Sequence, residues 1–124
     1  LSTELSRVRF NAIYASPLKR AFQTAEAVAN RHGLDVQTSK ELLEAHTGVW
    51  EGKDWDEIRT NWPLEFAGHE EDPALHGYPG GESFDEVLRR SSPEIESLCR
   101  KHAGGSILIV GHNVVNRVCL AHWM

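Results

Sequence analysis

The sequence lacks the features expected of a membrane protein or a nucleic-acid-binding protein. No apolar run approaches the roughly 20 residues of a membrane span, and no signal-peptide pattern opens the chain. Lysine and arginine are scattered and the formal net charge is -5, so no basic stripe is available for a nucleic acid. These absences predict no nucleic-acid partner, no membrane partner and a cytoplasmic location.

Cysteine is scarce, and no metal-binding spacing occurs. Cys99 and Cys119 form no C-x-x-C pair and each has apolar neighbours, so we expect both to be reduced core residues. His69 and His76 lie in an irregular stretch without partners at the spacing of zinc ligands. The sequence therefore predicts no metal site.

What is present is the composition of one globular domain. Of the 124 residues, 40% are hydrophobic and 25% are charged. An apolar run at residues 10–15 predicts a buried strand, after which Ser16 and Pro17 predict the cap and first residue of a helix that Gly33 ends. Alternation at residues 34–38 predicts a second, short strand.

The second half combines an irregular stretch with regular elements. Residues 45–82 are rich in tryptophan, proline and glycine and are expected to form a lid or pocket wall, in which only residues 55–62 have a helical pattern. Residues 83–101 have helical spacing and open with a capping box. The apolar run at residues 106–110 predicts a strand covered on both faces, with a new helix after His112.

Arg20 lies just after the point where the first predicted strand passes into its helix. The carboxyl ends of parallel strands and the free N–H groups of a helix start are where α/β proteins bind anions. A guanidinium there can hold a phosphate through two hydrogen bonds. A surface arginine near a well-capped helix explains the same pattern, so this stretch alone leaves both interpretations open.

His112 and Glu44 are the other candidates for chemistry. His112 follows the last predicted strand, at the same edge of the sheet, with Asn113 opening the next helix; a histidine there can donate to phosphate oxygens or polarise a leaving group. A core or capping histidine is the alternative, which loses weight because two strand ends converge. Glu44, beside bulky apolar groups and near an anion, would favour its neutral form and serve as general acid. Spacing does not separate it from Glu41 or Glu51.

Four motifs occur in a fixed order along the chain. They are S-x-L-x-R-A-x-x-T-A at residues 16–25, L-x-E-x-x-x-G-x-W-E-G at residues 42–52, Gly-Gly-Glu-Ser at residues 80–83, and a strand followed by G-H at residues 107–112. In these motifs the chain resembles the histidine phosphatase superfamily, which includes cofactor-dependent phosphoglycerate mutases. The pattern is most similar to the ribazole-phosphatase-like or general phosphatase branches.

The resemblance implies a role for each candidate residue. Arg20 would bind the transferring phosphoryl group, Glu44 would carry the proton to and from the leaving oxygen, and His112 would stabilise the pentavalent transition state. Asn113 and Ser16 would add donors at the pocket edge. The implied chemistry is phosphoryl transfer through a phosphohistidine, without metal or cofactor, on a small phosphorylated metabolite.

The nucleophile implied by the resemblance is not among the candidates. In the family it lies in an R-H-G motif a few tens of residues before S-x-L-x-R-A, whereas only fifteen residues precede Ser16 here. Residues 31–33 spell Arg-His-Gly but lie between a helix and a strand, where Gly33 has an ordinary capping role, so His32 is expected to be a decoy. We expect this chain by itself to be inactive.

The expected fold is α/β, a three-layer α/β/α sandwich with a mostly parallel sheet. Residues 1–124 would form a single domain, truncated at both ends and lacking its first central strand. The resemblance implies a gap for that strand between the strands ending at Ala15 and Val110, about twice the usual 4.8 Å spacing. The isolated chain should then be unstable as a monomer. Three arrangements would avoid this: a segment outside the 124 residues supplies the strand, which we favour; a second copy supplies it by swapping in a homodimer; or the two strands close up against each other in a rearranged sheet.

Three functions are compatible with these observations. A phosphomonoester phosphatase is favoured, and a phosphoglycerate mutase is the alternative enzyme. From a different class, a non-catalytic phosphate-binding pseudoenzyme would keep Arg20 and His112 without the nucleophile.

Overall fold

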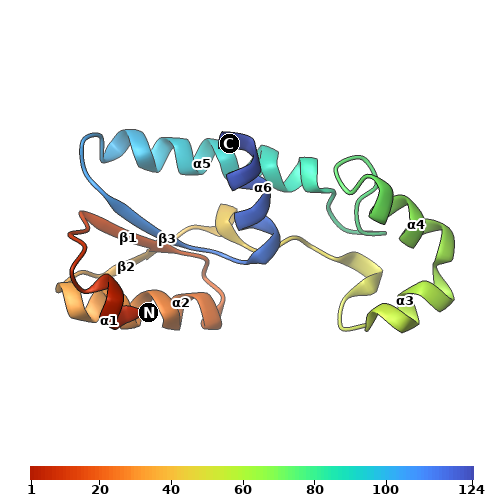
Figure 1. Cartoon of the computed structure of the whole chain (residues 1–124), viewed down its shortest axis with the longest axis horizontal. Coiled ribbons are helices and arrows are strands. Elements are labelled where there is room, and N and C mark those ends of the chain that lie inside the picture. The colour runs from red at the N-terminus through yellow and green to blue at the C-terminus, as the bar shows by residue number, and fades with distance from the viewer.

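The computed structural model describes all 124 residues and has three layers (Figure 1). A parallel sheet of three strands, in the order β2-β1-β3, lies between α2 on one face and α5 on the other. This confirms the α/β/α sandwich. The elements are α1 (Ser2–Leu5), β1 (Ala12–Ala15), α2 (Lys19–His32), β2 (Val36–Thr38), the 3-10 turns η1 (Lys40–Leu42) and η2 (Gly48–Trp50), α3 (Trp55–Asn61), α4 (Pro63–Glu71), α5 (Phe84–Lys101), β3 (Ile107–Val110) and α6 (Asn113–Trp123).

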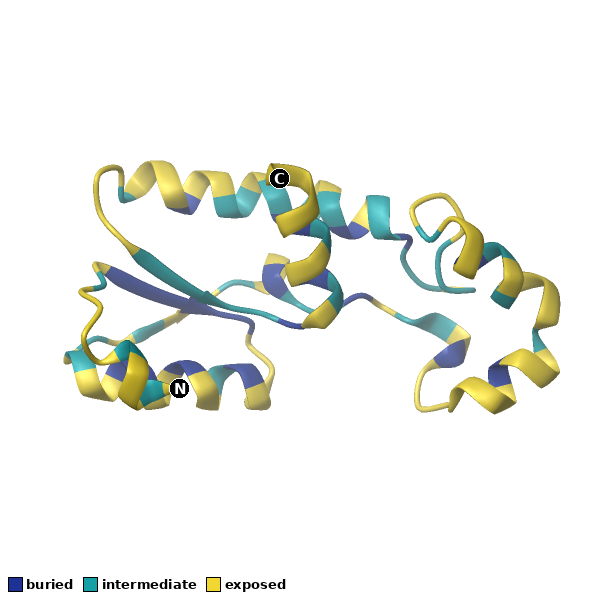
Figure 2. Ribbon diagram, in the orientation of Figure 1, coloured by how far each residue is buried: buried dark blue, intermediate teal, exposed yellow.

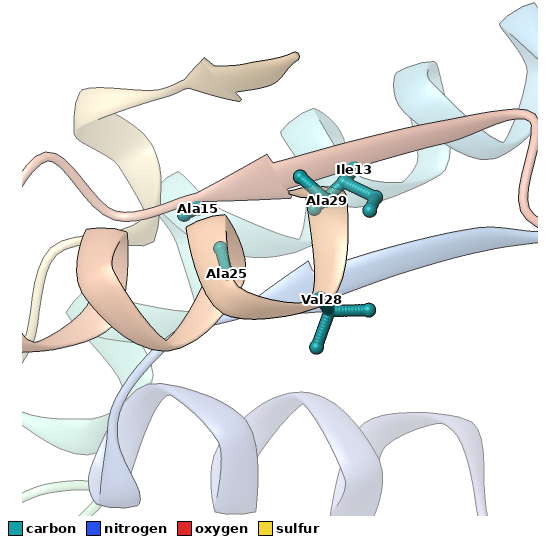
Figure 3. Packing of buried hydrophobic residues seen from close by; sticks show 5 residues of the cluster. All are labelled: Ile13, Ala15, Ala25, Val28 and Ala29. Atoms are coloured by element: carbon teal, nitrogen blue, oxygen red, sulfur yellow. The ribbon is translucent and has the colours of Figure 1, made fainter. Parts of the chain in front are cut away.

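Strand β1 is the centre of the core, and all four of its residues are buried. Successive side chains of a strand point to opposite faces. Ile13 and Ala15 therefore meet the small inner face of α2, formed by Ala25, Val28 and Ala29 (Figure 3). Ala12 and Tyr14 pack on the other face of the sheet, against Leu42 and Leu98.

The expected gap between β1 and β3 is wrong, because the two strands pair directly. Ala12 lies opposite Ile107 and Ala15 opposite Val110, in parallel register. The N–H of Ser16 continues the ladder, donating to the Val110 carbonyl at 3.0 Å. Since β1 has hydrogen-bonded partners on both sides, the centre of the sheet holds no facing rows of unpaired groups, and the predicted instability loses its basis.

Strand β3 is an edge strand, which explains a second difference. The unbroken apolar run predicted a strand covered on both faces, yet all four residues of β3 are only half-buried. Figure 2 shows the contrast with the fully buried β1. Cys99 also differs from expectation: it is exposed on α5, whereas Cys119 is buried as predicted.

Helix boundaries follow the sequence except at the start of α2. The left-handed Gly33 (φ 65°) ends α2, and α5 begins with a complete capping box formed by Ser83 and Glu86. Ser16 is not the cap that its sequence position predicts, since α2 begins at Lys19 after Leu18. Ser16 extends the β1 ladder instead, and its hydroxyl oxygen accepts the N–H of Leu18 at 3.3 Å.

Residues 45–82 project to one side of the sheet and carry α3 and α4 (Figure 1). The sequence pattern predicted only α3; the proline at the first position of α4 suits a helix start, because its missing N–H is not needed there. Aromatic rings fill this region, with Trp50 edge-on to both His69 and Tyr78 at 5.6 and 5.9 Å between centroids.

The two ends of this projecting segment touch each other. The N–H of Glu82 donates to the His46 carbonyl at 2.8 Å, and the N–H of Val49 donates to the Pro79 carbonyl at 2.9 Å. A Cβ atom at Gly81 would collide with the His46 carbonyl oxygen, so this approach requires glycine.

None of the helices combines the length and apolar character needed to cross a bilayer.

Candidate functional site

Two paired strands deliver Ser16 and His112 to the same edge of the sheet. β1 ends one residue before Ser16, and β3 ends two residues before His112, which is the N-cap residue of α6. The Nε2 atom of His112 lies 2.8 Å from the Oγ atom of Ser16. Both side chains are buried, with exposed fractions of 7% and 0%. The predicted convergence of strand ends is therefore present in the structure.

The environment of His112 favours its neutral form. Burial lowers the pKa of His112 below its ordinary value, and the nearby positive charge of Arg20 lowers it further, while the negative charge of Glu44 acts in the opposite direction. Neutral imidazole can both donate and accept a hydrogen bond. Arg20 and Glu44 thus act on His112 in opposite directions.

Arg20 is the second residue of α2 and lines an open cavity of about 790 Å³ together with Glu44. Trp50, Trp55 and Tyr78 contribute aromatic walls to the same cavity. Arg20 makes no ion pair with a carboxylate, so its guanidinium is available to an anion. Burial raises the pKa of Tyr78, and the charge of Glu44 raises it further, which keeps this phenol protonated as a donor.

Glu44 binds the start of α6 through both carboxylate oxygens. Oε2 accepts the N–H of Val114 at 2.9 Å, and Oε1 accepts the N–H groups of Val115 at 3.1 Å and Ala45 at 2.9 Å. The first N–H groups of a helix have no partner within the helix, and a carboxylate there is also favoured by the helix dipole. The sequence did not predict these donors.

Glu41 and Glu51, the alternatives to Glu44, line the same cavity but are held differently. The carboxylate of Glu51 accepts the hydroxyl of Thr47, and the side chain of Glu41 makes no hydrogen bond within the chain. Only Glu44 joins the segment after β2 to the helix that His112 caps. This contact distinguishes it geometrically from the other two.

Asn113 and His32 lie outside this cluster. Asn113 is exposed and borders a smaller hollow of about 250 Å³, beside Arg117 and Tyr78. His32 ends α2 near the opposite edge of the sheet, where its ring nitrogens contact the carbonyl oxygens of Val8 at 2.7 Å and Val28 at 2.9 Å. The structure therefore does not bring His32 to the site.

Arg90 is a residue that the sequence analysis missed. It lies on α5 and forms a two-point ion pair with Glu82, with nitrogen–oxygen distances of 2.7 and 3.0 Å. The same guanidinium donates to the carbonyl oxygens of Glu41 at 2.8 Å and Glu44 at 3.2 Å. Arg89 and Arg90 are adjacent on α5, and nothing in the local sequence pattern distinguishes Arg90 from the exposed Arg89.

A family model described as histidine phosphatase superfamily (branch 1) matches residues 1–124. Phosphoserine phosphatase 1 of Hydrogenobacter thermophilus is 32% identical over 117 residues, which are 94% of this chain and 56% of that protein. The structure of Bacillus stearothermophilus YhfR has a TM-score of 0.90 at 35% identity, covering 98% of this chain and 60% of that one.

A complex of mycobacterial glucosyl-3-phosphoglycerate phosphatase with inorganic phosphate is also similar, with a TM-score of 0.89 at 29% identity. The match covers 98% of this chain and 62% of that one. The chain thus spans between 56% and 62% of the length of these three proteins.

Proposed function

Since the chain belongs to the histidine phosphatase superfamily, we propose that the protein is a phosphomonoester phosphatase that works through a phosphohistidine intermediate. The observation that carries the proposal is the shared edge of the sheet. There an unpaired Arg20 faces the cavity, Glu44 lines it, and His112 is hydrogen-bonded to the buried Ser16. A cation, a proton carrier and a neutral donor are the groups that metal-free phosphoryl transfer uses beside its nucleophile.

Each residue has a defined part in the proposed reaction. Arg20 binds the phosphoryl oxygens, and His112 and Ser16 supply donors to the pentavalent transition state, whereas Asn113 borders the neighbouring smaller hollow. A histidine nitrogen attacks phosphorus while the bond to the leaving oxygen breaks, and Glu44 gives that oxygen its proton. Glu44 then takes a proton from the water that attacks the phosphohistidine, which releases inorganic phosphate and restores both residues.

The nucleophilic histidine in this proposal is supplied by a segment outside the 124 residues. The placement of His32 away from the cavity supports this, because its ring is held by main-chain carbonyls at the other edge of the sheet. The substrate class is a small phosphorylated metabolite. Phosphatases named for phosphoserine and for glucosyl-3-phosphoglycerate are among the similar proteins, which supports this class without selecting one compound.

Phosphoglycerate mutase activity is the second candidate, and a phosphate-binding pseudoenzyme is the third. The full-length protein should be assayed for phosphate release from a panel of small phosphomonoesters in the presence of EDTA. We expect activity that persists in the chelator, together with an acid-labile phosphoenzyme trapped by rapid quenching. Conversion of 3-phosphoglycerate to 2-phosphoglycerate without net phosphate release would identify a mutase instead.

Variants of the proposed site complete this test. His112→Ala and Glu44→Gln should each lower turnover by about a hundredfold or more, whereas His32→Ala should leave both turnover and phosphoenzyme formation unchanged. Loss of the phosphoenzyme in His32→Ala would contradict the proposal. A protein that binds vanadate but turns over no substrate would be a pseudoenzyme.

A cytoplasmic location and a homodimer stay predictions.

A further inference from the structure

The guanidinium of Arg90 is almost fully committed to contacts within the chain. Arginine has five N–H donors, and Arg90 uses four hydrogen bonds to bind Glu82 and the carbonyl oxygens of Glu41 and Glu44. Its side chain is only 21% exposed. Although Arg90 borders the same cavity as Arg20, it has little capacity left to bind a phosphate. Its chemistry is directed at the chain, not at a ligand.

Glu82 extends this contact from Arg90 to the main chain of His46. Besides binding Arg90, its Oε1 atom accepts the N–H of His46 at 2.9 Å. The bond to Arg90 lowers the pKa of Glu82, so the pair stays charged throughout the neutral range. A planar guanidinium matches the carboxylate and both carbonyls at once, which the single point charge of a lysine does not. Helix α5 is thereby fixed to the segment at residues 41–46.

That segment carries Glu44. Its main chain is bound by α5, and its side chain is bound by α6. The carbonyl of Glu44 accepts from Arg90, while its carboxylate accepts from Val114 and Val115 at the start of α6. We propose that Arg90 is a positioning residue that, with Glu82, holds Glu44 where it transfers the proton in the reaction proposed above. Arg90 acts through the carbonyls of Glu41 and Glu44 and does not touch the reacting phosphoryl group.

The test uses the first step of the reaction, in which a proton donor matters only for a poor leaving group. In the second step Glu44 takes a proton from water whichever substrate was used. An alkyl phosphate needs its leaving oxygen protonated, whereas p-nitrophenyl phosphate releases a stable phenolate. In the full-length protein, Arg90→Met should lower the rate constant for phosphoenzyme formation, measured in a single turnover, by about tenfold or more for an alkyl phosphate, with about twofold or less change for p-nitrophenyl phosphate. The substrate concentration that half-saturates this first step should change little for both, because Arg20 still binds the phosphoryl group.

Arg89→Met is the matched control. Arg89 is the preceding residue on α5 and pairs with Asp85 on the exposed face, so its loss should change neither substrate. Arg90→Lys keeps the positive charge but loses the planar arrangement of N–H donors, so it should restore only part of the alkyl phosphate activity. Equal losses on both substrates would show a general structural role and overturn the inference, as would full activity of Arg90→Met.

A second measurement does not depend on activity. The amide NMR signals of Val114 and Val115 report the carboxylate of Glu44, and Arg90→Met should shift them in the direction seen in Glu44→Ala, while Arg89→Met leaves them in place. If Arg90→Met fails to fold, Glu82→Gln replaces it. The glutamine oxygen can still accept the N–H of His46, but the ion pair with Arg90 is lost. Unshifted signals overturn the inference; a wild-type protein without activity overturns only the proposed function.

Discussion

The Nε2 atom of His112 lies 2.8 Å from the Oγ atom of Ser16, although 96 positions separate the two residues. Their contact depends on the direct pairing of β1 with β3, because each residue lies just beyond the end of one of these strands. Ser16 thereby fixes the direction in which the buried ring of His112 faces. The hydroxyl is the only polar side-chain partner of that ring nitrogen within the chain.

Replacing Ser16 with alanine tests this contact. Ser16→Ala removes the partner of a buried ring nitrogen and the acceptor of the Leu18 N–H, which together should lower the free energy of unfolding by about 1 to 3 kcal/mol. Urea unfolding monitored by circular dichroism measures the change. Ser97→Ala, at an exposed position of α5, is the control and should change stability little. Equal stability of the two variants would mean that His112 does not need Ser16.

The charges around His112 can be tested by titration. Arg20 lowers the pKa of His112 and Glu44 raises it. Arg20→Ala should therefore raise the pKa of His112, and Glu44→Gln should lower it further. Two-dimensional NMR of the imidazole carbons measures both changes. Shifts in the same direction in the two variants would show that a conformational change, and not charge, dominates.

Anion binding should separate the roles of Arg20 and Glu44. In the proposed reaction the arginine contacts the anion in every state, whereas the glutamate is needed when the leaving oxygen takes a proton. We expect Arg20→Ala to weaken vanadate binding by about tenfold to a hundredfold, the value of one charge-assisted hydrogen bond, and Glu44→Gln to change it much less. Isothermal titration calorimetry measures both, with Lys19→Ala as the matched loss of a neighbouring positive charge. Equal losses for Arg20→Ala and Glu44→Gln would assign Glu44 a structural role in anion binding.

His32 should make stability depend on pH. Both ring nitrogens face carbonyl oxygens, of Val28 and Val8, so only the doubly protonated ring satisfies both, and these bonds raise the pKa of His32 above 6.5. Because the pKa of His32 is higher in the folded state than in the unfolded state, protonation stabilises the folded protein. This stabilisation is fully present at a pH below the unfolded-state pKa and is lost as the pH rises through the folded-state pKa.

Denaturation at pH 6 and pH 8 checks this prediction. The wild-type protein should lose stability over that interval by more than His32→Gln does, because the variant has no ring to deprotonate. His122→Gln, on the exposed last turn of α6, should behave like the wild-type protein. A pH dependence that is identical in wild-type protein and His32→Gln would contradict the prediction.

The sequence was most informative where one residue alone determines local structure. Gly33 and the Ser83 cap end and begin helices as predicted, because a left-handed glycine and a capping serine act within a few residues. Arg20 and His112 could be placed at one edge of the sheet, because parallel strands present their carboxyl ends together.

What the sequence did not predict depends on contacts between distant segments. The pairing of β1 with β3 cannot be seen in the two runs themselves, since every apolar strand could pair with any other. Arg90 contacts Glu41 and Glu44 across 49 and 46 positions, and its helical spacing suggested only an exposed face. Two of the three donors to the Glu44 carboxylate, Val114 and Val115, come from the start of a helix 70 and 71 positions later.

The contact between His46 and Glu82 turns the projecting segment into a closed loop whose two ends meet. Closing a loop costs little more entropy as the loop grows, so its length and content can change while its ends stay in place. Arg20, Glu44 and His112 all lie outside the segment at residues 49–79. Sequence changes in the cavity wall made by this segment can thus alter the shape of the cavity without moving the three groups that we propose to act on the phosphate.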